Sequence, residues 1–224
     1  MMNKRIDGKI GFPAKHGLYD PTLEKDSCGV GFVAHVKGVA SHEILTDAYH
    51  INSRMDHRGG CGFEVNTGDG AGILTAIPHK FMRKVAAQLG ITLPEPGTYA
   101  VGNVFLPQDA AKRAELKERF AAAVASEGLT LLGFREVPIE PDGADIGPAA
   151  RDAMPFIEQI IVGGGNKSDA EGFDRTLFLA RKKFIGPAKH DYPDDLIYVC
   201  SLNSRVLVYK GMLTPSQLFP FYPD

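Results

Sequence analysis

The sequence is short of cysteine, of long apolar runs and of net charge, and each shortage excludes a class of protein. Its three cysteines, Cys28, Cys61 and Cys200, are an odd number, and their spacing matches no zinc or iron–sulfur ligand pattern. We therefore expect no disulfide scaffold and a reducing, cytoplasmic location. No apolar run approaches the ~18–20 residues of a membrane-spanning helix. No apolar segment follows the basic N-terminus either, so secretion is not expected.

The charges are nearly balanced, with 25 Lys and Arg against 27 Asp and Glu and a formal net charge of -2. Such a chain has no electrostatic attraction to nucleic acid or to an anionic membrane. We therefore expect small molecules or protein surfaces as partners. Hydrophobic residues make up 44% of the 224 positions, which permits a sizeable core in one large domain or two small ones.

The hydrophobic pattern predicts a mixture of strands and helices from position 28 onward. Expected strands cover residues 28–36, 73–77, 99–106, 129–137 and 156–162, and expected helices cover residues 41–56 and 78–89. Asp109 is expected to cap a third helix, and Ser168 with Glu171 forms a capping box for a fourth. A hairpin is expected over residues 196–209 and a loop over 138–153. This irregular order fits an α/β layered sandwich better than a doubly wound parallel sheet.

Three segments carry the strongest functional signal, because they occur together and in order. They are Leu18-Tyr-Asp-Pro21 with Asp26-Ser-Cys-Gly-Val-Gly-Phe32, Met55-Asp-His-Arg-Gly-Gly-Cys-Gly62, and Asn66-Thr-Gly-Asp-Gly-Ala-Gly-Ile73. Later stretches agree as well, at Tyr99–Gly102, Ile157–Gln159, Tyr198–Leu202 and Val208–Gly211. One such motif alone would be weak, but several in register are specific. Together they resemble the class II glutamine amidotransferase domain that opens the large subunit of glutamate synthases, and the likeness covers about residues 17–224.

The resemblance implies a fold and a division of the chain. The family belongs to the N-terminal-nucleophile hydrolases, so an α+β fold with a four-layer αββα sandwich is expected. Residues 28–224 would form the N-terminal portion of this domain. Residues 1–27, which have little apolar periodicity and end in a charged run, would be a propeptide. Cys28 would become the first residue after their removal and would act as the nucleophile.

Cys28 suits this chemistry because a thiolate can attack the unreactive carboxamide of glutamine, giving a thioester that water then hydrolyses. A free cysteine has a pKa of ~8.5, so it needs a base beside it. A freed α-amino group, with a pKa of ~7.7–8.0, can take that proton. Removal of residues 1–27 would therefore activate the site. Without the flanking motifs, Cys28 would be interpreted as a buried structural cysteine.

Four further residues are assigned to the substrate site by the same resemblance. Arg58 is expected to order the site, and the Gly59 backbone to touch L-glutamine. Thr67 and Asp69 are expected to line the same pocket. The plainer alternatives are a surface salt bridge for Arg58 and an Asx-type turn for Asp69. The two other cysteines are expected to be structural, and no metal site is expected because no histidine pair has the helical spacing of one.

The sequence departs from the family in its last part. The family's site also uses an Arg in an Arg-Phe-Ser-Thr-Asn-like segment, an Asn-Gly oxyanion hole in a His-Asn-Gly-Glu-like segment, and a later Asp that holds the substrate's amino group. None of these segments occurs in the 224 residues. We therefore expect a sandwich that is incomplete at its C-terminal side. The isolated chain should be weak or inactive, because one lost oxyanion donor can cost a factor of ~10²–10³ in rate.

The parent activity implied by the resemblance is glutamate synthesis. Glutamine would be hydrolysed to glutamate and ammonia, and the ammonia would be joined reductively to 2-oxoglutarate at a distant site. FMN and an iron–sulfur cluster would serve that second site, outside this chain. The implied partners are L-glutamine, the rest of the large subunit and a small flavoprotein subunit.

Two alternatives stay open. The chain could be the amidotransferase domain of another class II enzyme, although the later motifs between Tyr99 and Gly211 argue against this. It could also be a non-catalytic remnant that pairs with a full-length subunit or only binds a ligand, and the missing oxyanion segment motivates that reading.

Overall fold

The computed structural model describes residues 5–6, 9–10, 15–20, 28–58, 61 and 64–224, and the chain divides into two units, Met1–Val30 and Gly31–Asp224. In the first unit, the short strands β1 (Arg5–Ile6) and β2 (Lys9–Ile10) pair in an antiparallel manner. His16 and Tyr19 form a β-bridge in the same unit.

The second unit is built around a four-stranded antiparallel sheet in the order β5-β6-β4-β7. Its strands are β4 (Tyr99–Leu106), β5 (Thr130–Glu136), β6 (Phe156–Gly163) and β7 (Tyr198–Val199). All eight residues of β4 are buried, so this strand is covered on both faces. A strand of this kind needs a packing layer on each side.

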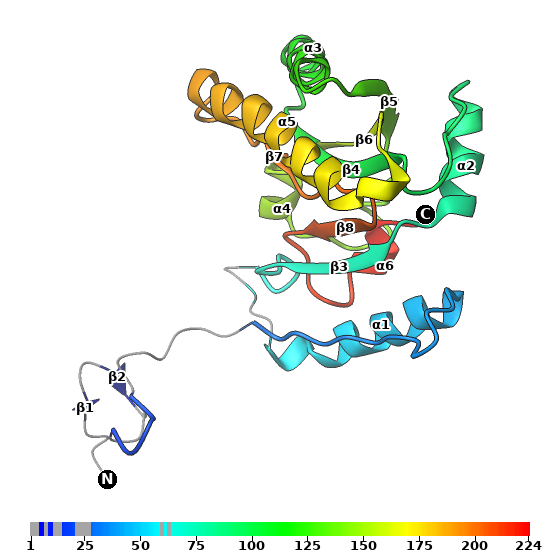
Figure 1. The fold of residues 1–224 in the computed structure, drawn as a ribbon. Helices are drawn as coiled ribbons and strands as arrows, with labels where there is room; N and C mark the ends of the chain where they lie inside the picture. Colours follow the sequence, from blue (N-terminus) through cyan, green and yellow to red (C-terminus); the bar gives the residue numbers. More distant parts are fainter. Residues whose placement is uncertain (1–4, 7–8, 11–14, 21–27, 59–60, 62–63) are drawn as a thin grey trace. The chain divides into compact units, whose positions relative to one another are not determined.

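Two long helices, α3 (Ala110–Ser126) and α5 (Ala170–Asp191), cover one face of this sheet (Figure 1). The stacked rings of Phe120 and Phe184 join the helices, with their centroids 4.2 Å apart. Both rings belong to a core that also contains residues of β4 and β6. Asp109 caps α3 as expected, since its side chain accepts a hydrogen bond from the backbone N–H of Lys112 at 2.8 Å.

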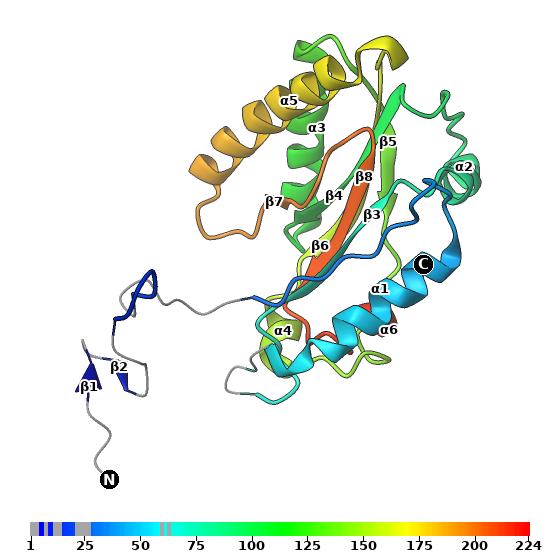
Figure 2. The ribbon, with the colours of Figure 1, turned by 60° about the horizontal axis from the view of Figure 1, so that its bottom comes forward.

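A second, two-stranded sheet packs against the other face. It contains β3 (Ala71–Ala76) and β8 (Val206–Gly211), which pair in an antiparallel manner. Helix α1 (His42–Arg54) lies on the far side of this sheet, as Figures 1 and 2 show. Helix α2 (His79–Gln88) closes one edge of the space between the sheets, where its Met82 and Val85 join a core with Tyr99 and Leu207.

The layers therefore run helix, sheet, sheet, helix, which confirms the expected α+β class and αββα order. The remaining elements are the 3-10 turns η2 (Asp56–Arg58) and η3 (Lys167–Asp169) and the short helices α4 (Pro148–Asp152) and α6 (Leu218–Phe221). In the described part of the chain, no helix combines the length and the apolar character that crossing a membrane requires.

Polar side chains also join the two sheets. Gln159 of β6 is fully buried, and its amide donates a hydrogen bond to the hydroxyl of Tyr209 on β8 at 2.8 Å. Within the larger sheet, Arg135 of β5 donates to the side-chain oxygen of Gln159 at 3.1 Å and so holds this amide in place. The amide of Asn103 on β4 donates to the backbone carbonyl of Val208 at 2.8 Å. These contacts fix how the sheets face each other, because each buried donor needs its partner.

Two strand predictions were wrong. Residues 28–36 form no strand in the structure, and the side chains of Val30, Phe32 and Val36 are exposed. A run of β-forming residues becomes a strand only where a neighbouring strand takes its N–H and C=O groups. In this segment the described hydrogen bonds belong to a turn, in which Gly38 N donates to the carbonyl of His35.

The predicted hairpin over residues 196–209 was also wrong, because its two strands belong to different sheets. β7 pairs with β4, whereas β8 pairs with β3. Between them, Asn203 forms a bridge with Val101, and its side-chain oxygen accepts from the backbone N–H groups of Arg205 and Val206. This turn carries the chain from one sheet to the other.

Two smaller predictions need correction. The region 138–153, expected as loop, contains helix α4, which begins with a proline at its first position. The capping box of Ser168 and Glu171 does not start α5. Asp169 caps this helix instead, accepting from the N–H of Gly172 at 2.9 Å, because the 3-10 turn η3 moves the start of the helix.

We expect the substitution Tyr209→Phe to lower the free energy of unfolding by about 1–3 kcal/mol, because the buried amide of Gln159 would lose its acceptor. Urea unfolding measures this change. Tyr49→Phe is the matched control. The ring of Tyr49 packs edge-on against Phe219, and loss of the Tyr49 hydroxyl should lower the free energy of unfolding by less than about 0.5 kcal/mol. Equal losses in the two variants would contradict a bracing role for the inter-sheet hydrogen bond.

Candidate active site

Cys28 lies near the end of the first unit, with an exposed side chain and a free thiol. Exposure suits a nucleophile that must meet a substrate, and it does not fit the alternative of a buried structural cysteine. The other residues expected at the site belong to the second unit. The approach of Cys28 to them therefore stays a prediction.

Arg58 is the last residue of η2, the 3-10 turn that follows α1. The helix ends at Arg54, and the backbone N–H of the next residue, Met55, donates to the carbonyl of Asn52. Arg58 is thus placed shortly after the first helix, as the motif led us to expect. Gly59 lies outside the described residues, so its contact with glutamine stays a prediction.

Thr67 lies in the loop before β3 and is buried. Its hydroxyl donates a hydrogen bond to the carboxylate of Glu64 at 2.6 Å, and its backbone N–H donates to the Glu64 carbonyl at 3.2 Å. Asp69, two residues later, is exposed. The loop therefore turns one predicted site residue inward as an anchor and leaves the other accessible to a ligand.

Gly68, between them, forms a β-bridge with Cys61 and packs directly on another part of the chain. A Cβ atom added to Gly68 would overlap the backbone of Leu213 and Thr214. Only a glycine permits this close approach of two backbones. The Thr67–Asp69 loop is thus pressed against the segment that follows β8.

The motif analysis missed Glu64, whose carboxylate anchors this loop to another part of the chain. One of its carboxylate oxygens accepts both from the Thr67 hydroxyl and from the backbone N–H of Ala149, the latter at 3.0 Å. The hydrogen bond from Thr67 has the larger effect and that from Ala149 the smaller, and together they hold the pKa of Glu64 below its usual value of 4.5. The Glu-x-x-Thr spacing could have suggested the first contact, but the second joins residues far apart in the sequence.

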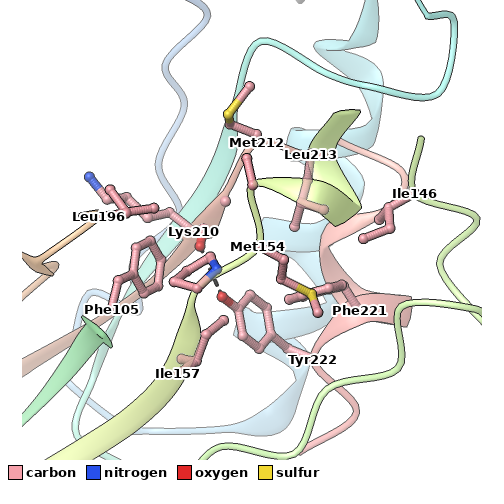
Figure 3. Close-up of a pocket in the computed structure, with 14 residues that line it drawn as sticks. Phe105, Ile146, Met154, Ile157, Leu196, Lys210, Met212, Leu213, Phe221 and Tyr222 are labelled. Atoms are coloured by element: carbon pink, nitrogen blue, oxygen red, sulfur yellow. Dashed lines mark hydrogen bonds between the residues drawn. The ribbon is translucent and has the colours of Figure 1, made fainter. Parts of the chain in front are cut away.

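An apolar pocket of about 80 Å³ lies between the sheets. Its lining includes Phe105 and Ile157 of the larger sheet, Lys210 of β8, and Phe221 and Tyr222 (Figure 3). The ammonium group of Lys210 donates a hydrogen bond to the Tyr198 hydroxyl at 2.8 Å, and the backbone carbonyl of Lys210 accepts one from the Tyr222 hydroxyl at 2.9 Å. Glutamine carries a carboxylate and an ammonium group that require polar partners. An apolar lining of this kind does not match them, so we do not assign the pocket as the glutamine site.

The described residues include no group of three or more His, Cys, Asp or Glu side chains that could hold a metal ion. The residues predicted for the site are thus a thiol, an arginine after α1 and an anchored polar loop. Such a set can perform acyl transfer, in which a thiol attacks a carbonyl and fixed groups orient the substrate.

Comparisons with known proteins agree with the motifs. A family model described as "Glutamine amidotransferases class-II" matches residues 28–224. The chain is 41% identical over 221 residues to "Glutamate synthase [NADH]" of Schizosaccharomyces pombe, covering 95% of this chain and 10% of that protein. It is 38% identical over 213 residues to "Glutamate synthase [NADPH] large chain" of Bacillus subtilis, covering 95% of this chain and 14% of that protein.

A plant relative agrees as well. The rice "Ferredoxin-dependent glutamate synthase, chloroplastic" is 39% identical over 201 residues, covering 90% of this chain and 12% of that protein. The chain thus spans a small share of the length of each of these relatives.

The three cysteines should differ in their reaction with thiol reagents. Burial raises the pKa of Cys200 to about 12, so at pH 8 only about one molecule in 10⁴ would carry its thiolate. Cys28 and Cys61 are exposed. We expect iodoacetamide to label the latter two first, with Cys200 slower by several orders of magnitude, as peptide mass spectrometry would reveal. Equal labelling of all three in the folded protein would contradict the burial of Cys200.

Proposed function

Because the chain belongs to the class II glutamine amidotransferase family, we propose that it supplies the glutamine-hydrolysing site of a glutamate synthase, with Cys28 as the nucleophile. The observation that carries the proposal is the family match over residues 28–224, which begins at this cysteine. Identities of 34–41% over 90–95% of the chain support the choice of glutamate synthase among the enzymes of the family.

In this reaction the Cys28 sulfur attacks the side-chain carboxamide carbon of L-glutamine and forms a C–S bond. The C–N bond then breaks, and the nitrogen leaves as ammonia after taking up a proton. Water attacks the resulting thioester and releases L-glutamate and the free thiol. The reaction is hydrolytic, so it needs neither an oxidant nor a reductant at this site.

The base would be the α-amino group of Cys28 itself, once residues 1–27 are removed. While the preceding peptide bond is intact, this nitrogen is an amide and cannot accept a proton. As a free amine with a pKa of ~7.7–8.0 it can take the thiol proton and deliver it to the leaving nitrogen. The exposure of Cys28 leaves its thiol accessible to such chemistry.

Arg58, Gly59, Thr67 and Asp69 would hold the substrate. We assign Arg58 to ordering the site and the Gly59 backbone to touching glutamine. Thr67 is buried and shapes the loop, and Asp69, which is exposed, would face the substrate. A carboxylate beside the ammonium group of glutamine would favour binding by charge attraction.

In the whole enzyme, the ammonia would pass to a second site and be joined reductively to 2-oxoglutarate. FMN and an iron–sulfur cluster would serve that site, in the part of the large subunit beyond this domain. A small flavoprotein subunit would be a further partner. The alternative, a non-catalytic binding module, predicts no glutamine-dependent ammonia release, so an assay of ammonia release separates the two proposals.

We expect Cys28→Ala to lower glutamine-dependent ammonia release by about 10³-fold or more in the protein produced from its own locus, because the attacking atom would be lost. Cys61→Ala is the matched control, since it removes another exposed thiol and should leave the rate within about twofold. Ammonia release that survives in Cys28→Ala would refute the nucleophile, and its absence from the unaltered protein would favour the non-catalytic module.

We further expect the mature protein to begin at Cys28. Intact mass with N-terminal sequencing of the protein produced from its own locus tests this, because removal of residues 1–27 creates the free amine that the mechanism requires. A mature protein that keeps Met1 would contradict the role of the α-amino group as the base.

A further inference from the structure

We propose that Glu64 and Gln217 are positioning residues for glutamine, because together they fix the Thr67–Asp69 loop to two other parts of the fold. This inference rests on the proposed function, in which that loop lines the glutamine pocket. Neither residue lies in the motif segments that suggested the family. Both act through hydrogen bonds that join segments distant in the sequence.

Glu64 provides the first attachment. Its carboxylate oxygen accepts from the Thr67 hydroxyl at 2.6 Å and from the Ala149 N–H at the start of α4 at 3.0 Å. A single charged acceptor thus joins the loop to the start of α4. Hydrogen bonds to an ionised acceptor are stronger than neutral ones, so this attachment restrains the Thr67 side chain.

Gly147 shows how closely these two segments fit. Its backbone N–H donates to the Asn66 carbonyl at 2.8 Å. A Cβ atom at this position would lie 2.6 Å from the Glu64 carboxylate and closer still to the Thr67 hydroxyl. Any side chain at position 147 would therefore push apart the pair that anchors the loop.

Gln217 provides the second attachment. It is buried, and its amide nitrogen donates to the carbonyls of Asn66 at 3.0 Å and Asp145 at 2.9 Å. Its amide oxygen accepts from the backbone N–H of Thr214 at 2.8 Å. One side chain therefore joins three segments, and all of its amide's partners are backbone groups.

The segment 213–217 also holds the other half of the predicted site. Asn52 of α1 is buried, and its amide donates to the carbonyl of Pro215 at 3.1 Å. Helix α1 leads directly into the turn that carries Arg58. The same short segment therefore braces both the Thr67 loop and the helix before Arg58, and it sets the distance between the two substrate-binding regions.

Such bracing matters because substrate-orienting groups lose much of their effect when they move by about 1 Å, which can reduce rates by ~10²-fold. Side chains that lock a binding group in place therefore help to keep it in its productive geometry. Loss of Glu64 or Gln217 should therefore weaken glutamine binding while Cys28 and its amine stay intact.

The test compares five variants of the full polypeptide, in glutaminase kinetics and in hydrogen exchange of peptides covering residues 61–73. Glu64→Ala removes the acceptor of both hydrogen bonds, and Gln217→Glu sets a carboxylate oxygen against two carbonyls. Gly147→Ala displaces the anchoring pair by steric overlap alone. Glu64→Gln keeps an acceptor oxygen and serves as the rescue variant. Glu118→Ala, at an exposed glutamate of α3, is the control.

We expect the first three variants to exchange faster over residues 61–73 and to raise KM for glutamine by about tenfold or more, with a smaller change in kcat. Glu64→Gln should stay within about threefold of the unaltered protein, and Glu118→Ala should match it. A merely structural role would lower the active fraction and thus the apparent kcat, with KM unchanged.

Three outcomes would overturn the proposal. Unchanged exchange over residues 61–73 would show that these side chains do not brace the loop. Faster exchange with an unchanged KM would show that the loop does not position glutamine, while Cys28-dependent turnover in the same samples would leave the proposed function standing. If the unaltered protein shows no such turnover, the proposed function fails, and the positioning role fails with it.

Discussion

The burial of β4 on both faces is the constraint on which the second unit depends. An antiparallel sheet can leave one face in water, but all eight residues of this strand are enclosed. The α3–α5 pair encloses one side, and the β3–β8 sheet encloses the other. Within the smaller sheet, β3 and β8 pair in an antiparallel manner with Ala71 opposite Gly211, so the loop before β3 and the segment after β8 meet at one end of that sheet.

That meeting point is where the Thr67–Asp69 loop lies against the segment after β8. The Thr67 loop precedes β3, the brace around Gln217 follows β8, and α1 lies beneath both strands. The apolar core thus decides which loops become neighbours. Buried polar contacts then decide how accurately those loops are held, since each donor must find a partner once water is excluded.

Local features were predictable from the sequence, whereas choices of partner were not. The strand Tyr99–Leu106 and the Asp109 cap follow from short-range patterns, and both have the predicted positions. The hairpin prediction was wrong because the alternation of apolar and polar residues indicates a strand but does not identify the strand that pairs with it. For the site, the motifs predicted the Thr67 loop. They could not identify Gln217, whose contact with Asn66 spans 151 positions of the chain.

The carboxylate of Glu64 makes the stability of its loop depend on acidic pH, whereas the packing of the apolar core does not depend on this group. A carboxyl group whose pKa is lowered in the folded state stabilises that state above its unfolded pKa, near 4.5. The stabilisation disappears as the pH falls through the lowered folded value, because the protonated group is a poorer acceptor for Thr67 and Ala149. Acidification would therefore loosen the loop locally, so that substrate affinity and global unfolding need not share one pH midpoint.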